Sequence, residues 1–275
     1  MRNICGFSAH PTEKVAYAGI SHLYEKWCSG DPAYEQTKRF YVRMLSRCEG
    51  PFLELGVGTG RLARELVQRQ AVDITGVDIC PEMLCICETA YRQQKEKGCP
   101  GTLRVELEDM TKLPYKDEFR TAYLPFRTVG HLLTEEDLAA MFRGVFCALK
   151  PGGIFLLDHY MFDPQWAEEH QDQDRPMYCD DTVKIEDHYY YHFEEGYMDC
   201  VIKVNGVAAD GFRFRWYAKE CLGQAAERAG FVLERLIGEF GGSAWNQESG
   251  NQIWLWRKPE SQISDTRKDL AYELL

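Results

Sequence analysis

The chain has 275 residues, of which 45% are hydrophobic and 13% aromatic, and its formal net charge is −11. This length fits one large domain, or one domain carrying an inserted lobe, with a sizeable core. The negative charge argues against a nucleic-acid-binding surface or an anionic-membrane surface, because phosphate groups would be repelled on average. Small substrates, or a local basic pocket, remain compatible with this composition.

Neither a signal-peptide-like N-terminus nor a run of about 18 uncharged apolar residues is present, so we expect a cytoplasmic protein without a membrane span. The eleven cysteines are scattered along the chain. Their tightest group, Cys80, Cys85 and Cys87, lacks a second Cys or His pair that would complete a tetrahedral metal site. We therefore expect reduced thiols and no metal.

The first part of the chain predicts two helices followed by an α/β core. The helices, at 14–28 and 33–45, are separated by the turn sequence SGDP. From Pro51 to Tyr160, short apolar runs alternate with helical stretches, which indicates βαβ units and a mostly parallel sheet covered on both faces. Strands are expected at 51–56, 72–78, 102–110, 121–126 and 154–160, and helices at 61–70, 81–97 and 135–149.

After Tyr160 the pattern changes. Residues 182–206 alternate like two antiparallel strands around an EEG turn, and 211–218 continues the alternation. A helix ending at Gly230 and strands at 231–240 and 251–258 complete the core. The predicted fold is α/β: a doubly wound, mostly parallel sheet with an antiparallel last strand and an antiparallel β insertion after the fifth strand. The expected units are a helical cap (1–50), a cofactor-binding core (51–161), the insertion (162–215), the last helix and two strands (216–258) and a tail (259–275).

The segment LELGVGTGRL places Gly56, Gly58 and Gly60 between a strand and a helix. Glycines at every second position let the backbone approach a ligand closely, and the helix N-terminus beyond them attracts an anionic group. Asp78 ends the next strand, where a carboxylate can accept the hydroxyls of a ribose. A dinucleotide site would have the G-x-G-x-x-G spacing, which is absent. Glu54 would repel a pyrophosphate but could support a cationic amine, so the pattern favours S-adenosylmethionine.

Together, LELGVGTGRL, ITGVDICPEML, LEDMTKLP and LKPGGIFLLDHY resemble the signature segments of class I S-adenosylmethionine-dependent methyltransferases. The resemblance covers roughly residues 16 to 258 in order. It is most similar in pattern to small-molecule N-methyltransferases of the amino-sugar or glycine/sarcosine type. It implies cofactor contacts from Tyr24, Glu54, Gly56, Gly58, Gly60, Asp78, Ile79, Met83, Asp109, Met110 and Leu124.

The resemblance also implies individual roles. Ile79 and Met83 would flank the adenine, and Asp109 with Met110 would meet its edge. Tyr24 resembles the N-terminal tyrosine that such enzymes fold over cofactor and acceptor, and it is therefore a catalytic candidate. The alternatives are core packing for Tyr24 and the two methionines, and a strand-end cap for Asp109.

The loop LPFRTVGHL follows the fourth strand, beside the expected position of the methyl group. It lacks the Asn-Pro-Pro-Tyr type of motif found in methyltransferases that act on nucleic-acid bases or protein amides, and instead resembles the loop of small-molecule enzymes. His131 is the candidate proton acceptor or orienting group near neutral pH, or else a packing residue. The expected acceptor contacts are Trp27, Phe126, Arg127, His131, Tyr160 and Trp245.

The insertion contains the aromatic segment HYYYHF at 188–193. At strand period, Tyr189, Tyr191 and Phe193 share one face, and His188, Tyr190 and His192 share the other. We expect one face to pack on the core, and the other could cover the substrate or pair two subunits. A homodimer is therefore left open.

The leading interpretation is an S-adenosylmethionine-dependent methyltransferase that acts on a small-molecule amine or hydroxyl by in-line transfer. A non-catalytic S-adenosylmethionine-binding module is one alternative, because fold alone does not establish activity. An NAD-dependent oxidoreductase is another, disfavoured by the glycine spacing and by the lack of a Tyr-x-x-x-Lys pair.

Overall fold

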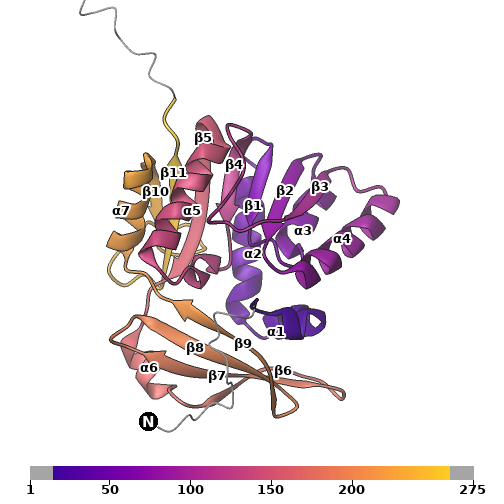
Figure 1. Cartoon of the computed structure of the whole chain (residues 1–275), viewed down its shortest axis with the longest axis vertical. Helices are drawn as coiled ribbons and strands as arrows, with labels where there is room; N and C mark the ends of the chain where they lie inside the picture. The colour runs from indigo at the N-terminus through magenta and orange to yellow at the C-terminus, as the bar shows by residue number, and fades with distance from the viewer. Residues whose placement is uncertain (1–14, 261–275) are drawn as a thin grey trace, which may run out of the picture.

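The computed structural model describes residues 15–260 and contains two β-sheets. Figure 1 shows the smaller sheet below the larger one, with α1 beside it. The strands are β1 (Phe52–Leu55), β2 (Asp73–Asp78), β3 (Thr102–Leu107), β4 (Phe119–Leu124), β5 (Leu149–Tyr160), β6 (Asp174–Cys179), β7 (Lys184–His192), β8 (Tyr197–Val204), β9 (Val207–Arg215), β10 (Val232–Ile237) and β11 (Asn251–Arg257). The helices are η2 (Ala18–Leu23), α1 (Tyr24–Ser29), α2 (Pro32–Leu45), α3 (Arg61–Arg69), α4 (Pro81–Glu96), η3 (Thr128–His131), α5 (Glu135–Ala148), α6 (Pro164–Glu169) and α7 (Lys219–Ala229).

The larger sheet has the strand order β10-β11-β5-β4-β1-β2-β3. Strands β1 to β5 pair in parallel with their neighbours, whereas β11 is antiparallel to both β5 and β10. Parallel neighbours require crossover connections, and the predicted helices between the strands supply them. The predicted doubly wound sheet with an antiparallel last strand is thus confirmed.

Successive side chains of the strands point to opposite faces of the larger sheet and pack into two separate hydrophobic cores. Leu53 and Leu55 of β1 pack with α5 and α7 on one face, whereas Phe52 packs with α2, α3 and α4 on the other. All residues of β1 are buried, as expected for a central parallel strand covered on both sides. This cover leaves the strand ends as the place where loops can reach a ligand.

The insertion forms a second, antiparallel sheet with the order β6-β7-β8-β9. The predicted hairpin is present, because β7 pairs with β8 from Ile185↔Val204 to His192↔Tyr197. The sequence analysis did not predict α6 or the edge strand β6. Pro176 lies within β6 and pairs across to Glu186, and a proline inside a strand is tolerated at a sheet edge.

The N-terminal helix expected at 14–28 is wrong in form. A 3-10 turn, η2, precedes the short helix α1 instead. Tyr17 adopts a left-handed conformation (φ 69°), and the Gly19 amide donates to Asp210 of β9 at 2.8 Å. A Cβ at residue 19 would lie 2.8 Å from the carbonyl oxygen of Ala209. The tertiary contact with β9 therefore bends the segment away from a regular helix.

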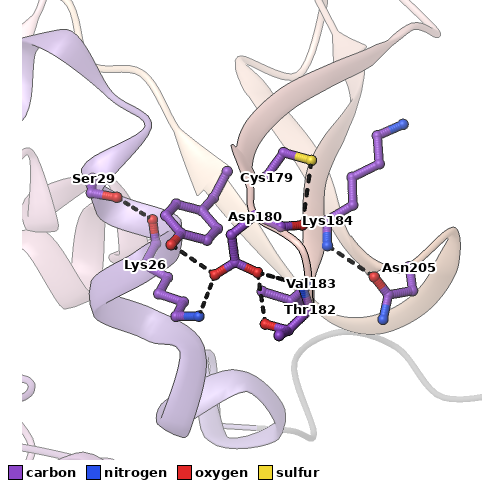
Figure 2. A network of polar contacts seen from close by, with 9 residues as sticks. Lys26, Ser29, Cys179, Asp180, Thr182, Val183, Lys184 and Asn205 are labelled. Carbon is purple, nitrogen blue, oxygen red and sulfur yellow. Dashed lines mark hydrogen bonds and ion pairs between the residues drawn. The ribbon is translucent and has the colours of Figure 1, made fainter.

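Polar contacts tie α1 to the insertion. Lys26 donates to Asp180 at 2.7 Å, in the turn between β6 and β7 (Figure 2). Asp180 also accepts from the amides of Thr182 and Val183, and together these donors hold the pKa of its carboxyl below the ordinary value, the Lys26 contact contributing most. The cap is thus attached to the second sheet as well as to the core. No helix within residues 15–260 is both long and apolar enough to cross a membrane.

Candidate functional site

A cavity of about 760 Å³ lies between the core, the N-terminal cap and the insertion. Its lining includes segments that follow β1, β2, β4 and β5, so it opens at the carboxyl ends of the parallel strands. It brings together the following predicted site residues: Tyr24, Trp27, Glu54, Gly56, Gly58, Asp78, Ile79, Met83, Met110, Phe126, Arg127, His131 and Tyr160.

The glycine loop needs its glycines for two different reasons. Gly56 has φ 64°, and a Cβ there would lie 2.6 Å from the Thr128 methyl carbon. Gly58 also has a positive φ, but a Cβ at that position would meet no atom within 4 Å. Gly56 thus serves close packing, whereas Gly58 leaves open space beside the cavity in which a ligand can approach the backbone.

Asp78 joins this loop to the end of β2. One carboxylate oxygen accepts from the Gly58 amide at 2.8 Å, and the other accepts from the Cys80 amide at 2.9 Å. Burial raises the pKa of Asp78, although the amide hydrogen bonds oppose the shift. Each oxygen keeps a further lone pair, so the carboxylate is held in place and can still accept hydroxyl groups from the cavity.

Glu54 lies within β1 and is 2% exposed. The Tyr123 hydroxyl donates to one of its oxygens at 2.9 Å. Burial raises the pKa of Glu54 to about 8, so in the free protein the carboxyl is mostly neutral at pH 7. A cation bound in the cavity would favour the ionised form, and the site therefore fits an amine.

His131 ends η3 and contacts a residue of the N-terminal cap that the sequence analysis did not single out. Its Nε2 lies 3.0 Å from the Tyr17 hydroxyl, and the His131 ring is packed by Phe212 and Phe214 of β9. Burial lowers the pKa of His131 to about 4, so the imidazole is neutral at pH 7. His131 is consequently a better hydrogen-bond acceptor than a proton acceptor.

Residues 52–153 match the family model described as a methyltransferase domain. The matched residues make up less than half of the chain. Among curated proteins, YqeM of Bacillus subtilis, provisionally named a methyltransferase, is 28% identical over 145 residues, or 52% of this chain and 55% of that protein. The match thus spans about half the length of this relative.

Solved methyltransferases share the fold of the domain and of its insertion. The CcbJ methyltransferase from Streptomyces caelestis superposes with a TM-score of 0.73 and 19% identity, covering 89% of this chain and 98% of that one. CalS10 from Micromonospora echinaspora, an amino pentose methyltransferase solved with S-adenosylmethionine bound, gives 0.55 and 19%, covering 91% and 100%. The predicted class I methyltransferase fold is thereby confirmed.

Three residues that the resemblance implied as cofactor contacts lie outside the cavity lining. Leu124 is completely buried in the core beside α5. Asp109 accepts from the amide and the hydroxyl of Thr111, which is the strand-end cap considered as its alternative. A Cβ on Gly60 would collide with the Cys87 sulfur, so this glycine serves the packing of α3 on α4.

Of the residues expected to contact the acceptor, all but Trp245 line the cavity. Trp245 does not line the cavity, and its ring lies beside the Lys219 ammonium at 5.0 Å instead. Arg127 lines the cavity 3.7 Å from Asp31, with its guanidinium 5.8 Å from the Tyr160 ring centre. Trp245 follows β10, and its amide donates to the Leu236 carbonyl oxygen at 3.2 Å, so the loop folds back on the end of that strand.

The insertion supplies the wall opposite the glycine loop. Tyr189 and Tyr191 of β7 line the cavity, so the aromatic face that packs inward is also a wall of the site. Asp187 of the same strand also lines the cavity. It accepts from the Trp27 indole at 2.6 Å and from the Tyr189 hydroxyl at 2.8 Å. The other face carries His188, which pairs with Asp172 and Asp174 near the surface.

Two residues of this wall were missed at the sequence level. Asp187 shares the inward face with Tyr189 at strand period, so an acidic residue on an otherwise aromatic face was the available signal. Tyr17 precedes Tyr24 by seven residues, a spacing that was visible but not interpreted. The contact of Tyr17 with His131 joins residues 114 positions apart and depends on the tertiary fold.

Proposed function

We propose that this protein transfers a methyl group from S-adenosylmethionine to a small-molecule amine or hydroxyl. One observation carries the proposal: a single cavity joins the glycine loop, Glu54 and Asp78 to an enclosed aromatic wall formed by the cap and the insertion. A site with both halves can hold a donor and an acceptor together.

The residues of the first half fit the cofactor. Glu54 would hold the ammonium of the methionine moiety, and Asp78 would accept the ribose hydroxyls. Ile79, which is 51% exposed, and Met83 offer apolar surface to the adenine. When bound, S-adenosylmethionine supplies a methyl group on a positively charged sulfur, which a lone pair of the acceptor can displace in line.

The residues of the second half would position the acceptor and exclude water. Transfer requires the attacking atom to be held about 3 Å from the methyl carbon. The neutral His131 ring, hydrogen-bonded to Tyr17, would orient an amine or hydroxyl rather than remove its proton, because its pKa is low. Tyr24 and Trp27 would close the site from the cap side.

Features of the sequence and of a fold neighbour support a small molecule as the methyl acceptor. The loop after β4 reads LPFRTVGHL, without the clamp typical of enzymes that act on planar amino groups of bases, and the chain is acidic. Among the fold neighbours, CalS10 is described as an amino pentose methyltransferase. We therefore place amino sugars and related small amines first among the acceptors to be tested, ahead of hydroxyl compounds.

The test has two parts. Calorimetry should show micromolar binding of S-adenosylhomocysteine, lost in Asp78→Ala and kept in Asp109→Ala. A screen with methyl-labelled S-adenosylmethionine over small amines, hydroxyl compounds and carboxylates should then label at least one amine or hydroxyl compound. Binding without transfer to any compound would favour the non-catalytic module, and tight NADH binding in place of S-adenosylhomocysteine would favour the oxidoreductase.

A further inference from the structure

Asp187 of β7 is a carboxylate in the part of the cavity wall that the insertion forms. It is 0% exposed, because its hydrogen-bond donors cover both oxygens. One oxygen accepts from the Trp27 indole of α1, and the other accepts from the Tyr189 hydroxyl. Both donors are neutral groups, so the hydrogen bonds fix the position of the carboxylate and leave its negative charge without a counter-ion.

The Asp187 carboxyl is mostly ionised at pH 7. Burial raises its pKa to about 6, and the hydrogen bonds from Trp27 and Tyr189 oppose this rise. Arg175 lies opposite Asp187 in the pairing of β6 with β7, and its charge also favours the ionised form. Within residues 15–260, however, no ion pair includes Asp187, and the Arg175 guanidinium lies 5.8 Å from the Trp166 ring centre. A buried charge without a counter-ion is costly, so a cationic ligand nearby would stabilise the site.

Aromatic rings form the cavity wall around this carboxylate. The Trp27 ring centre lies 5.5 Å from that of Tyr17 and 6.2 Å from that of Phe212, and all three residues line the cavity with Tyr189. No lysine or arginine of residues 15–260 lies over the rings of Trp27, Tyr17 or Phe212. Burial raises the pKa of the Tyr17 hydroxyl, and the charge of Asp187 adds to this shift, so its field extends across the wall. Aromatic faces beside an anion are suited to an ammonium group.

We propose that Asp187 and the aromatic rings around it select a methyl acceptor that carries a cationic amine. This inference rests on the proposed function and narrows its acceptor from an amine or hydroxyl compound to one with an ammonium group. Asp187 is a positioning residue in the recognition of the acceptor: it orients Trp27 and Tyr189, and its charge makes the potential beside their rings negative. A neutral compound of the same shape gains nothing from that potential.

The experiment compares two probes of one shape, cyclohexylamine and cyclohexanol, of which only the amine is cationic at pH 7. Each is titrated by ligand-observed NMR into the protein saturated with S-adenosylhomocysteine, so that the cofactor half of the cavity is filled. The wild type should bind the amine at least about tenfold more tightly than the alcohol. This comparison tests the inference independently of any variant.

Asp187→Asn removes the charge but keeps an oxygen for the Trp27 indole and an amide that can donate to the Tyr189 hydroxyl. It should reduce the preference for the amine to less than about threefold, mainly by weakening binding of the amine. Thermal unfolding checks that this variant is folded. Asp174→Asn is the matched control, because Asp174 lies in the same sheet and bonds His188 on the other face, and it should keep the preference.

The outcomes separate the inference from the proposed function. An unchanged preference in folded Asp187→Asn would mean that Asp187 only ties the cap to the insertion, and it would overturn the inference. Equal affinity of the wild type for the two probes, or binding of neither, would also overturn it. Methyl transfer to hydroxyl compounds without an ammonium group would do the same while the proposed function stands. If the wild type does not bind S-adenosylhomocysteine, the proposed function itself fails.

Discussion

Glu54 and His131 line one cavity, and burial shifts their pKa values in opposite directions because it disfavours the charged form of each. It raises the pKa of the Glu54 carboxyl to about 8 and lowers that of the His131 imidazole to about 4. Both side chains are therefore mostly neutral at pH 7 in the free protein. Glu54 is held by a hydrogen bond from the Tyr123 hydroxyl, and His131 by a hydrogen bond with the Tyr17 hydroxyl.

Binding of S-adenosylhomocysteine should release a proton from Glu54 near pH 7. The pKa of this carboxyl rises from the ordinary glutamate value of 4.5 to about 8 on folding, so its contribution to stability is present below pH 4.5 and is lost as the pH rises through 8. The ligand ammonium favours the ionised form, so affinity should rise between pH 6 and 8, by at most about tenfold per pH unit. Calorimetry in buffers of different ionisation enthalpy measures the release, and Glu54→Gln should abolish it. A pH-independent affinity would contradict a carboxyl–ammonium contact.

His131→Ala should lower turnover by about tenfold or more, equivalent to about 1.4 kcal/mol of barrier, with little change in cofactor affinity. Tyr17→Phe removes the hydroxyl that meets Nε2 and should produce a smaller loss of the same kind. Steady-state kinetics with the acceptor found in the screen, together with calorimetry of S-adenosylhomocysteine, separates the two effects. Unchanged turnover in both variants would leave His131 as a packing residue.

At the scale of elements, the closure of the site depends on contacts between the cap and the insertion. The cap reaches β9 through Gly19 and reaches the turn after β6 through Lys26 and Asp180. Gly30, which ends α1, packs against the backbone of Met177 in β6, and a Cβ there would overlap the Met177 carbonyl oxygen. The cap and the second sheet therefore form one wall of the cavity.

Gly30→Ala should force this wall apart. Overpacking against backbone typically costs about 1–3 kcal/mol, which corresponds to a midpoint of thermal unfolding lower by roughly 2–12 °C for a domain of this size. Binding of the acceptor should weaken as well, because Trp27 and Tyr24 move with α1. Gly241→Ala is the matched control, since a Cβ at 241 meets no atom within 4 Å. Equal unfolding midpoints for the two variants would show that the contact at Gly30 is easily relieved.

At the scale of the whole molecule, the cavity joins parts of the chain that lie far apart in sequence. Its lining comes from the cap, the core and the insertion. A ligand that bridges these parts binds the folded state alone and so stabilises the fold as a unit.

S-adenosylhomocysteine should therefore raise the midpoint of thermal unfolding. At a free concentration of about 100 times Kd the gain is about 2.7 kcal/mol. This amounts to roughly 5–10 °C for a chain of this size. Differential scanning calorimetry measures the shift, which should disappear in Asp78→Ala. A shift of the same size in that variant would mean that the ligand binds elsewhere.

Local sequence determined the core of this protein and the glycine loop that lines its cavity. Alternating strands and helices, the glycines at 56, 58 and 60, and Asp78 are local patterns. They predict structure because periodicity and backbone freedom are properties of short segments. The Asp78 carboxylate at the end of β2 accepts from the Gly58 amide of the glycine loop. The parallel pairing of β1 to β5 was predicted from the alternation of strands and helices.

Only the tertiary structure decided which residues of the cap and the insertion line the cavity. Tyr17 meets His131 across 114 residues, Trp27 meets Asp187 across 160, and neither pairing has a local signal. Trp245 and Leu124 also lie outside the cavity lining, because the loop of Trp245 bonds back to β10 and the Leu124 side chain packs in the core. The pKa of His131 likewise depends on desolvation by packed neighbours, and burial is a property of the folded chain rather than of a motif.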